Sequence, residues 1–146
     1  MARFEMSIVI SRSIEEVFAV LADLTNDPKW RREWVEGRKT SQGPLGVGAR
    51  YLLVAPLLLW RLEAEYEVTQ YEPNRVTAWK TVRGPLPLTF WRRVEQADGG
   101  ARVTIGYGME LKGAAKVLAP LAKSAGQRAL AGDFPKLKQL MEARAL

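Results

Sequence analysis

The residues that could carry out chemistry in this 146-residue sequence are restricted, because the chain contains no histidine and no cysteine. Histidine is the most common general base at neutral pH and the usual ligand of transition metals, and cysteine supplies thiolate nucleophiles and disulfides. Carboxylates, tyrosines, lysines, arginines and hydroxyl groups remain. We therefore expect no metal site and no bound cofactor, and any enzyme activity must work without either.

Three residues are candidates for catalysis, namely Arg92, Tyr107 and Glu110. Strand alternation from Leu88 and Phe90 places Arg92 on the inward face, where a guanidinium can orient a carboxylate or an enolate. The opposite register would turn Trp91 inward instead, and the sequence leaves this choice open. Tyr107 and Glu110 qualify as acid, base or hydrogen-bonding groups by residue type alone.

The N-terminal segment predicts a strand followed by a helix. Apolar residues alternate with polar ones from Phe4 to Ile10, as in a half-buried strand. Ser13 and Glu16 then form a capping box, and apolar residues follow at helical spacing as far as Leu21.

A second short helix is predicted to begin at the Asp27–Pro28 pair, with an acidic cap and a proline at its first position. Trp30 and Trp34 are four residues apart, so they would share the face of this helix that lies toward the sheet. The Arg31–Arg32 pair between them would then point to solvent or to the rim of any cavity.

From residue 37 the pattern favours β-strands, with runs near 48–56, 59–71, 75–83, 86–96 and 101–111. Turn signals separate these runs and no helix intervenes, which indicates an antiparallel meander. Beyond Gly113 a helical pattern returns, and Pro120 and Pro135 predict kinks or breaks in it. Its apolar stripe consists of Val117, Leu118, Leu121, Ala125, Leu130, Phe134, Leu137, Leu140 and Met141.

Composition indicates a single domain over residues 1–146. Twenty-two basic residues against 16 acidic ones give a net charge of +6, which favours anionic partners only weakly. The start "MARFEMSIVI" does not have the features of a signal peptide, and the most apolar stretch, "YLLVAPLLLW", is too short to span a bilayer as a helix. We therefore expect a cytoplasmic protein without a transmembrane segment.

The predicted elements form an α+β fold: a curved antiparallel sheet of about six or seven strands wrapped around a long C-terminal helix, with two short helices after the first strand. With this order of elements, the chain resembles the SRPBCC or START-like superfamily, whose members have the helix-grip fold. Within that superfamily it resembles the polyketide cyclase/dehydrase-like branch. The stretches that carry the resemblance span almost the whole chain: "SRSIEEVFAVLADL", the D-P-x-W of residues 27–30, "GPLGVGARY", "YEVTQYEPNRVTAW", "GGARVTI" and "LKQLME".

The resemblance implies a mostly apolar cavity between the sheet and the long helix, which in such proteins binds lipids, polyketides or other hydrophobic molecules. The residues that would line it are Trp30, Trp34, Tyr51, Tyr66, Trp79, Phe90, Tyr107, Met109, Leu121 and Ala125. For each aromatic residue the alternative is an ordinary position in the core. Gly106 and Gly108 predict space for a ligand or a bend in the sheet, and the leucines of "APLLLW" predict an exposed patch for a partner, a membrane surface or a lid.

Three functions remain open. The first is binding of a hydrophobic small molecule, and the second is a cyclase or dehydratase that polarises its substrate with arginine or tyrosine. The third, suggested by the net charge and by Trp-Arg-Arg at residues 30–32 and 91–93, is a protein or nucleic-acid interaction module. We expect the first, with no nucleic-acid partner and as a monomer or homodimer, and we leave transient membrane contact open.

Overall fold

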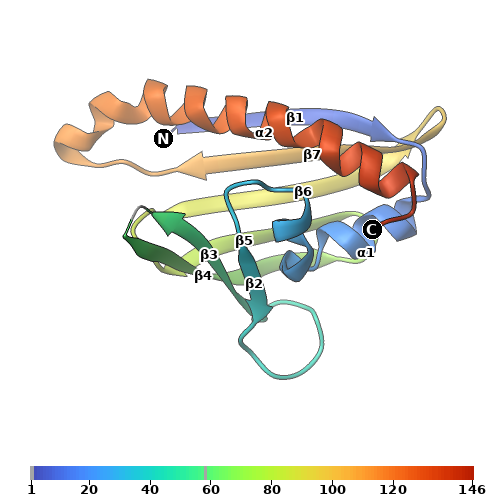
Figure 1. Cartoon of the computed structure of the whole chain (residues 1–146), viewed down its shortest axis with the longest axis horizontal. Coiled ribbons are helices and arrows are strands. Elements are labelled where there is room, and N and C mark those ends of the chain that lie inside the picture. Colours follow the sequence, from blue (N-terminus) through green and yellow to red (C-terminus); the bar gives the residue numbers. More distant parts are fainter. Residues whose placement is uncertain (1, 58) are drawn as a thin grey trace.

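The computed structural model describes residues 2–57 and 59–146, and across them the chain forms one seven-stranded antiparallel sheet beneath a long helix (Figure 1). The strands are β1 (Ala2–Ile10), β2 (Glu36–Lys39), β3 (Arg50–Leu57), β4 (Trp60–Glu72), β5 (Val76–Arg83), β6 (Leu88–Ala97) and β7 (Gly100–Met109). Their spatial order is β1-β7-β6-β5-β4-β3-β2. Strands β3 to β7 are therefore the predicted meander. Strand β2, which none of the predicted runs covers, adds to β3 at one edge of the sheet, and β1 pairs with β7 at the other.

The first helix, α1 (Ile14–Leu21), begins at the predicted capping box. The Ser13 hydroxyl accepts a hydrogen bond from the Glu16 amide at 3.2 Å and donates one to the Glu16 carboxylate at 2.9 Å. Val17, Phe18 and Leu21 are buried on the face that packs against the sheet. The prediction of this helix from local signals is confirmed.

The Asp27–Pro28 pair lies near the end of a helix and does not begin one, which corrects the prediction. A 3₁₀ helix, η1 (Leu24–Lys29), starts after Asp23, whose carboxylate accepts a hydrogen bond from the backbone two residues on at 3.0 Å. The chain leaves helical geometry at Trp30, where φ is −129° and ψ is −22°. Trp30 and Trp34 therefore do not share a helical face, because no helix continues between them.

The C-terminal helix, α2 (Ala119–Glu142), follows a 3₁₀ turn, η2 (Gly113–Leu118). The helical pattern predicted beyond Gly113 is thus divided just before Pro120, where the 3₁₀ turn gives way to α-helix, but α2 runs on for 24 residues without a break at Pro135. Pro120 lies in its first turn, where a missing N–H costs little. Its second half is buried through Leu130, Phe134, Leu137 and Met141.

The first half of α2 and the turn before it contradict the continuous apolar stripe, because three of its members are exposed to solvent. Val117 is 78% exposed, Leu118 52% and Leu121 67%. The inward face of this half instead carries the small residues Ala122, Ala125, Gly126 and Ala129. At Gly126 the helix comes so near to β1 that a Cβ atom would lie 2.7 Å from the ring of Phe4.

The outer face of the sheet explains Gly106 without a ligand. A Cβ atom at Gly106 would lie 2.2 Å from the indole of Trp91, which covers this position on β7. Trp91 donates a hydrogen bond to Glu5 at 2.5 Å, and the guanidinium of Arg3 lies 4.6 Å from the centre of its ring. Trp91 and Arg93 thus face outward, and Arg92 faces the interior.

The core consists of two apolar clusters on the helical side of the sheet. The first packs α1 and the second half of α2 against β1, β6 and β7, and it includes Trp30. The second lies on β3 to β6 next to η1, and it includes Tyr51, Tyr66 and Trp79. These two clusters leave the space beneath the first half of α2 unfilled.

Candidate functional site

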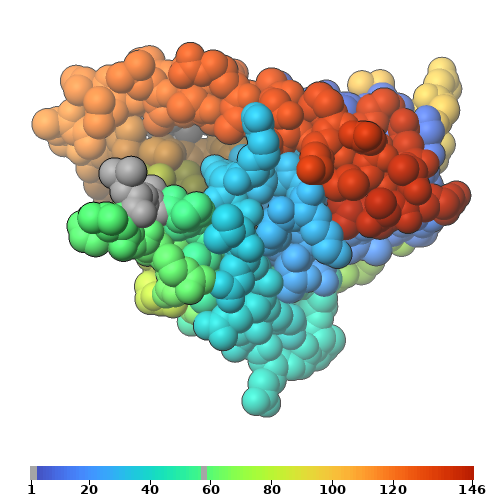
Figure 2. All heavy atoms as spheres, viewed as in Figure 1, coloured from blue at the N-terminus to red at the C-terminus, as the bar shows by residue number. Residues whose placement is uncertain are grey.

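A cavity of about 610 Å³ lies between the first half of α2 and the concave face of the sheet. Figure 2 shows the surface hollowed below the first turns of α2, beside the β3–β4 hairpin. Four charged residues line it, Asp27, Arg31, Glu33 and Lys123. The remaining lining is apolar or aromatic and includes Phe4, Trp34, Leu53, Leu62, Tyr66, Leu88, Phe90, Tyr107, Met109, Leu111 and Leu118.

A row of four aromatic rings crosses the sheet beside this cavity. Phe4, Tyr107, Phe90 and Trp79 are direct cross-strand partners on β1, β7, β6 and β5. Their ring centres are 5.6, 5.6 and 4.9 Å apart in that order, and successive ring planes differ by only 17° to 26°. Tyr66 meets Phe90 edge to face at 5.0 Å. The row arises because one residue in register on each strand carries a ring, and such pairs stabilise neighbouring strands.

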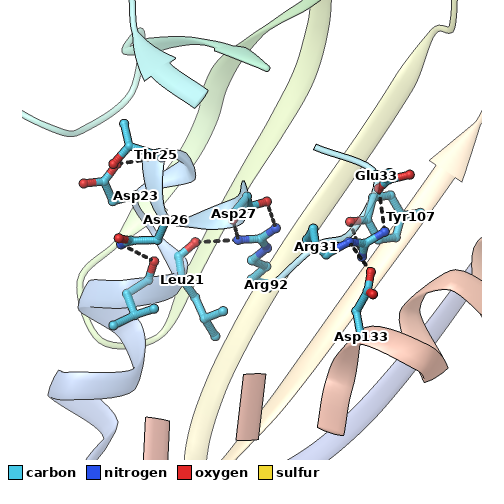
Figure 3. Close-up of polar contacts among 11 residues, drawn as sticks. Leu21, Asp23, Thr25, Asn26, Asp27, Arg31, Glu33, Arg92, Tyr107 and Asp133 are labelled. Carbon is cyan, nitrogen blue, oxygen red and sulfur yellow. Dashed lines mark hydrogen bonds and ion pairs between the residues drawn. The ribbon is translucent and has the colours of Figure 1, made fainter. Parts of the chain in front are cut away.

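Arg31 is the centre of a polar corner of the cavity (Figure 3). It follows η1 and is only 3% exposed. One terminal nitrogen donates to the Tyr107 hydroxyl at 3.0 Å, and the other donates to the Glu33 carboxylate at 2.7 Å. Its Nε lies 3.2 Å from Asp133 of α2, within ion-pair distance but without hydrogen-bond geometry. Arg31 therefore connects the loop after η1 to β7 and to the long helix.

The ionisation of this corner follows from burial and from the neighbouring charges. Burial raises the pKa of the Tyr107 phenol, and the adjacent Arg31 and Arg92 charges offset this only in part. Burial disfavours the charge on Arg31, but the influence of Tyr107 and of the surrounding carboxylates outweighs it, so the pKa of Arg31 lies above its ordinary value. At neutral pH, Arg31 is a cation and Tyr107 a neutral phenol.

Arg92 points inward as predicted, but its guanidinium forms a second buried ion pair, with Asp27, and does not face the cavity. Its guanidinium binds the Asp27 carboxylate through two hydrogen bonds, at 2.9 and 2.6 Å, and also donates to the Leu21 carbonyl at 2.9 Å. It lies 5.3 Å from the ring centres of both Trp30 and Trp79, one from each apolar cluster. Arg92 therefore lies between the two core clusters and does not line the cavity, whereas its partner Asp27 does, so the pair extends from the core to the cavity wall.

The structure brings six of the ten predicted ligand-binding residues to the cavity: Trp34, Tyr66, Phe90, Tyr107, Met109 and Ala125. Trp30, Tyr51 and Trp79 belong to the packed core, since each is no more than 1% exposed and none lines the cavity. Leu121 is exposed to solvent, because the inward face of the first half of α2 is made of small residues instead. Of the catalytic candidates, only Tyr107 lines the cavity, and Glu110 is exposed outside it.

The sequence reasoning missed Arg31, Glu33 and Asp133. Arg31 and Glu33 lie in an irregular segment, where no periodicity indicates which side chains point inward. Asp133 did carry a signal, because it stands on the apolar face of α2 between Leu130 and Leu137. A carboxylate on a buried face requires a cation, and two arginines supply it: Arg31 forms an ion pair with Asp133, and Arg32 donates a hydrogen bond to it at 3.1 Å.

The two Trp-Arg-Arg stretches have different geometries. In the first, Trp30 and Arg31 are buried and Arg32 is exposed, so the expectation that both arginines face solvent or the rim is wrong in part: Arg31 lines the cavity wall. In the second, alternate residues face opposite sides of the sheet. Neither a group of acidic side chains suited to a metal ion nor a helix long and apolar enough to cross a membrane is found among residues 2–57 and 59–146.

Residues 1–142 match the family of polyketide cyclases/dehydrases and lipid-transport proteins. The chain belongs to this family. The resemblance drawn from the sequence is thereby confirmed over almost its whole length, and so is the helix-grip fold. No curated protein sequence matches the chain.

Solved structures with the family's fold superpose over nearly the whole chain. The protein TTHA0849 from Thermus thermophilus gives a TM-score of 0.79 at 15% identity and covers 99% of both chains. The Zhui aromatase/cyclase from Streptomyces sp. R1128 gives 0.73 at 14% identity, over 99% of this chain and 95% of that one. The di-domain ARO/CYC StfQ of the steffimycin biosynthetic pathway gives 0.75 at 12% identity, over 97% of this chain and 49% of that one. At these identities the likeness shows the fold alone.

Proposed function

We propose that this protein binds a neutral hydrophobic small molecule, of lipid, polyketide or aromatic type, in the cavity beneath the first half of α2. The observation that carries the proposal is the cavity itself: its volume of about 610 Å³ and its mainly apolar lining are typical of small-molecule sites. Membership of a family that includes lipid-transport proteins supports it further.

The aromatic row favours a flat ligand. Phe4, Tyr107 and Phe90 stack on one another, so each hides ring faces against its neighbours and leaves mainly ring edges for the cavity. Ring edges carry partial positive charge and attract the electron-rich face of another aromatic or conjugated system. A planar conjugated ligand lying on this row would gain both apolar burial and this attraction.

The polar corner favours an uncharged oxygen on that ligand. Its three arginines, Arg31, Arg32 and Arg92, are matched by three carboxylates, those of Asp27, Glu33 and Asp133. At these arginines a ligand carboxylate would therefore have to displace an existing partner, and the other cation of the lining, Lys123, lies on α2 outside this corner. Tyr107 accepts its hydrogen bond from Arg31, so its own hydroxyl proton remains available for a carbonyl or hydroxyl oxygen in the cavity.

Binding can be tested with the neutral fluorophore 1-aminoanthracene and a pair of matched substitutions on α2. Ala122→Phe fills the cavity from its helical wall, whereas Ala131→Phe adds the same ring on the exposed side of the helix. We expect the first to weaken binding by about tenfold or more, which corresponds to ~1.4 kcal/mol of steric exclusion, and the second to leave it unchanged. Equal affinities for the two variants would contradict the proposal. Native mass spectrometry before and after organic extraction would identify a co-purified ligand.

A second candidate function, cyclisation or dehydration of a polyketide, is favoured by the hydrogen bond from Arg31 to Tyr107. A phenol held in this way can donate to a substrate carbonyl as negative charge develops on its oxygen, while the cavity holds the chain in a reactive fold. Incubation with a linear poly-β-ketone thioester tests this. Tyr107→Phe should lower turnover about 10²-fold and leave the affinity for 1-aminoanthracene nearly unchanged. If the wild-type protein does not turn over the thioester, the cyclase or dehydratase function is rejected and only ligand binding remains.

A further inference from the structure

Large apolar side chains are exposed around the mouth of the cavity, and we call this set the rim. It consists of Leu59, Trp60, Leu86, Val117, Leu118 and Leu121. Leu59 is 98% exposed, Val117 78% and Trp60 74%. Soluble monomers seldom expose so many large apolar residues together, and such patches usually mark a contact with a partner or a membrane.

The rim comes from three separate segments that meet at the cavity. Leu59 and Trp60 lie at the tip of the β3–β4 hairpin, whose neighbouring residues Ala55 and Leu62 line the cavity. Leu86, in the β5–β6 connection, and Leu118, at the end of η2, are themselves both exposed and part of the cavity lining. In Figure 1 the hairpin tip and the η2–α2 junction lie at the same end of the molecule. The apolar surface of the rim thus continues into the apolar lining.

Basic side chains accompany the rim on its helical side. Between Glu110 and Asp133 the chain carries four basic residues and no acidic one. These are Lys112, Lys116, Lys123 and Arg128, all exposed. In the part of the chain that the structure describes, none of the four forms an ion pair. Exposed leucines, a tryptophan and unpaired lysines together match the composition of surfaces that bind at the interface of anionic bilayers.

We propose that the rim docks this protein on the surface of an anionic lipid bilayer. The apolar side chains enter the interface between headgroups and acyl chains, and the lysines of η2 and α2 contact the lipid phosphates. In this orientation the mouth of the cavity faces the bilayer, so an apolar ligand passes between the two without crossing water. That last step rests on the proposed function, but the docking itself does not.

The charges favour a bilayer over a second copy of the chain. A symmetric dimer through the rim would place the four basic residues of one copy against the same four of the other. A nucleic acid is disfavoured because the centre of the surface is apolar. An anionic bilayer offers both an apolar phase for the leucines and phosphates for the lysines.

Vesicle flotation tests the proposal, with phosphatidylcholine vesicles compared with vesicles that also contain phosphatidylglycerol. We expect binding to the anionic vesicles, with Leu121→Gln about tenfold weaker and Lys112→Gln/Lys116→Gln about fivefold weaker for each charge removed. Two controls carry the same changes elsewhere: Val47→Gln removes a 70% exposed apolar side chain from the β2–β3 loop, and Lys136→Gln removes an exposed lysine from the second half of α2. Both should bind like the wild type.

The outcomes separate this proposal from the proposed function. No binding to anionic vesicles, or equal losses for the rim variants and their controls, would overturn the docking even if 1-aminoanthracene still bound in the cavity. Loss of that probe with vesicle binding intact would instead overturn ligand binding and leave the docking in place. Self-association of the wild type that Leu121→Gln abolishes, together with an absence of vesicle binding, would assign the rim to a dimer and reject the bilayer.

Discussion

The two halves of α2 cover the same sheet with opposite results. In the second half, Leu130, Leu137 and Met141 are fully buried against β1, β7 and α1. In the first half, the inward positions hold alanine and glycine, and a cavity of about 610 Å³ remains beneath them. The difference shows that a single helix covers both the packed part and the hollow part of this fold, and that large side chains face the sheet in the packed part whereas small ones line the cavity.

The ion pair between Arg92 and Asp27 lies at the boundary between these two regions, and breaking it should have the largest effect. Arg92→Met leaves the Asp27 carboxylate buried without a partner, so we expect the free energy of unfolding to fall by about 3–5 kcal/mol. Arg93→Met makes the same change on the next residue, which pairs with Glu5 at the surface, and should cost about 0–1 kcal/mol. Urea unfolding measures both. Similar losses for the two variants would show that the boundary pair has no special role.

Truncating leucines in the two halves of α2 tests the comparison directly. Leu137→Ala opens a void in the filled region and should lower the free energy of unfolding by about 2–5 kcal/mol. Leu121→Ala removes a side chain that is 67% exposed and should change it by less than about 0.5 kcal/mol. The measurement is thermal or urea unfolding of the ligand-free protein. A substantial loss for Leu121→Ala would mean that the first half of α2 is also packed.

The sequence predicts most of the fold because its signals are local. Ser13 and Glu16 define the start of α1 without help from distant residues, and strand alternation with turn residues defines the meander. The end of η1 was not predictable in this way, since no local signal marks Trp30 as the point where the helix ends, and the buried partner of Asp27 is an arginine 65 residues further along the chain. Local spacing alone therefore gave the wrong relation between Trp30 and Trp34.

The candidate site was predictable only in part, for a related reason. Cross-strand rings such as Phe90 and Tyr107 follow from strand alternation once the register is fixed. By contrast, Leu121 and Leu137 both occupy apolar positions of the same helical pattern, yet Leu121 is exposed and Leu137 is buried. The two leucines differ in their surroundings: small residues of α2 line the cavity near Leu121, whereas large side chains pack against the sheet around Leu137. Arg31 lies in irregular backbone, and only its buried partner Asp133 indicated that a cation was needed.

The smallest expected effect is the loss of stability at low pH when the Glu16 carboxylate, at the start of α1, takes up a proton. Hydrogen bonds from Arg12 and Ser13, with the further charge of Arg144, lower the pKa of the Glu16 carboxyl from its ordinary 4.5 to about 2. A pKa that is lower in the folded state means that the folded protein binds this proton less readily than the unfolded chain does. The contacts of Glu16 therefore stabilise the fold above pH 4.5, and this contribution is lost as the pH falls from about 4.5 to about 2.

The comparison of Glu16→Gln with Glu15→Gln measures this contribution, because both change a carboxylate in the first turn of α1. At neutral pH, Glu16→Gln should unfold at a lower urea concentration than the wild type, and the difference between them should shrink as the pH falls from 4.5 toward 2. The side chain of Glu15 forms no hydrogen bond or ion pair within the described residues, so Glu15→Gln should show the same pH dependence as the wild type. A gap between Glu16→Gln and the wild type that is independent of pH would mean that Glu16 supports the helix through packing and not through its charge.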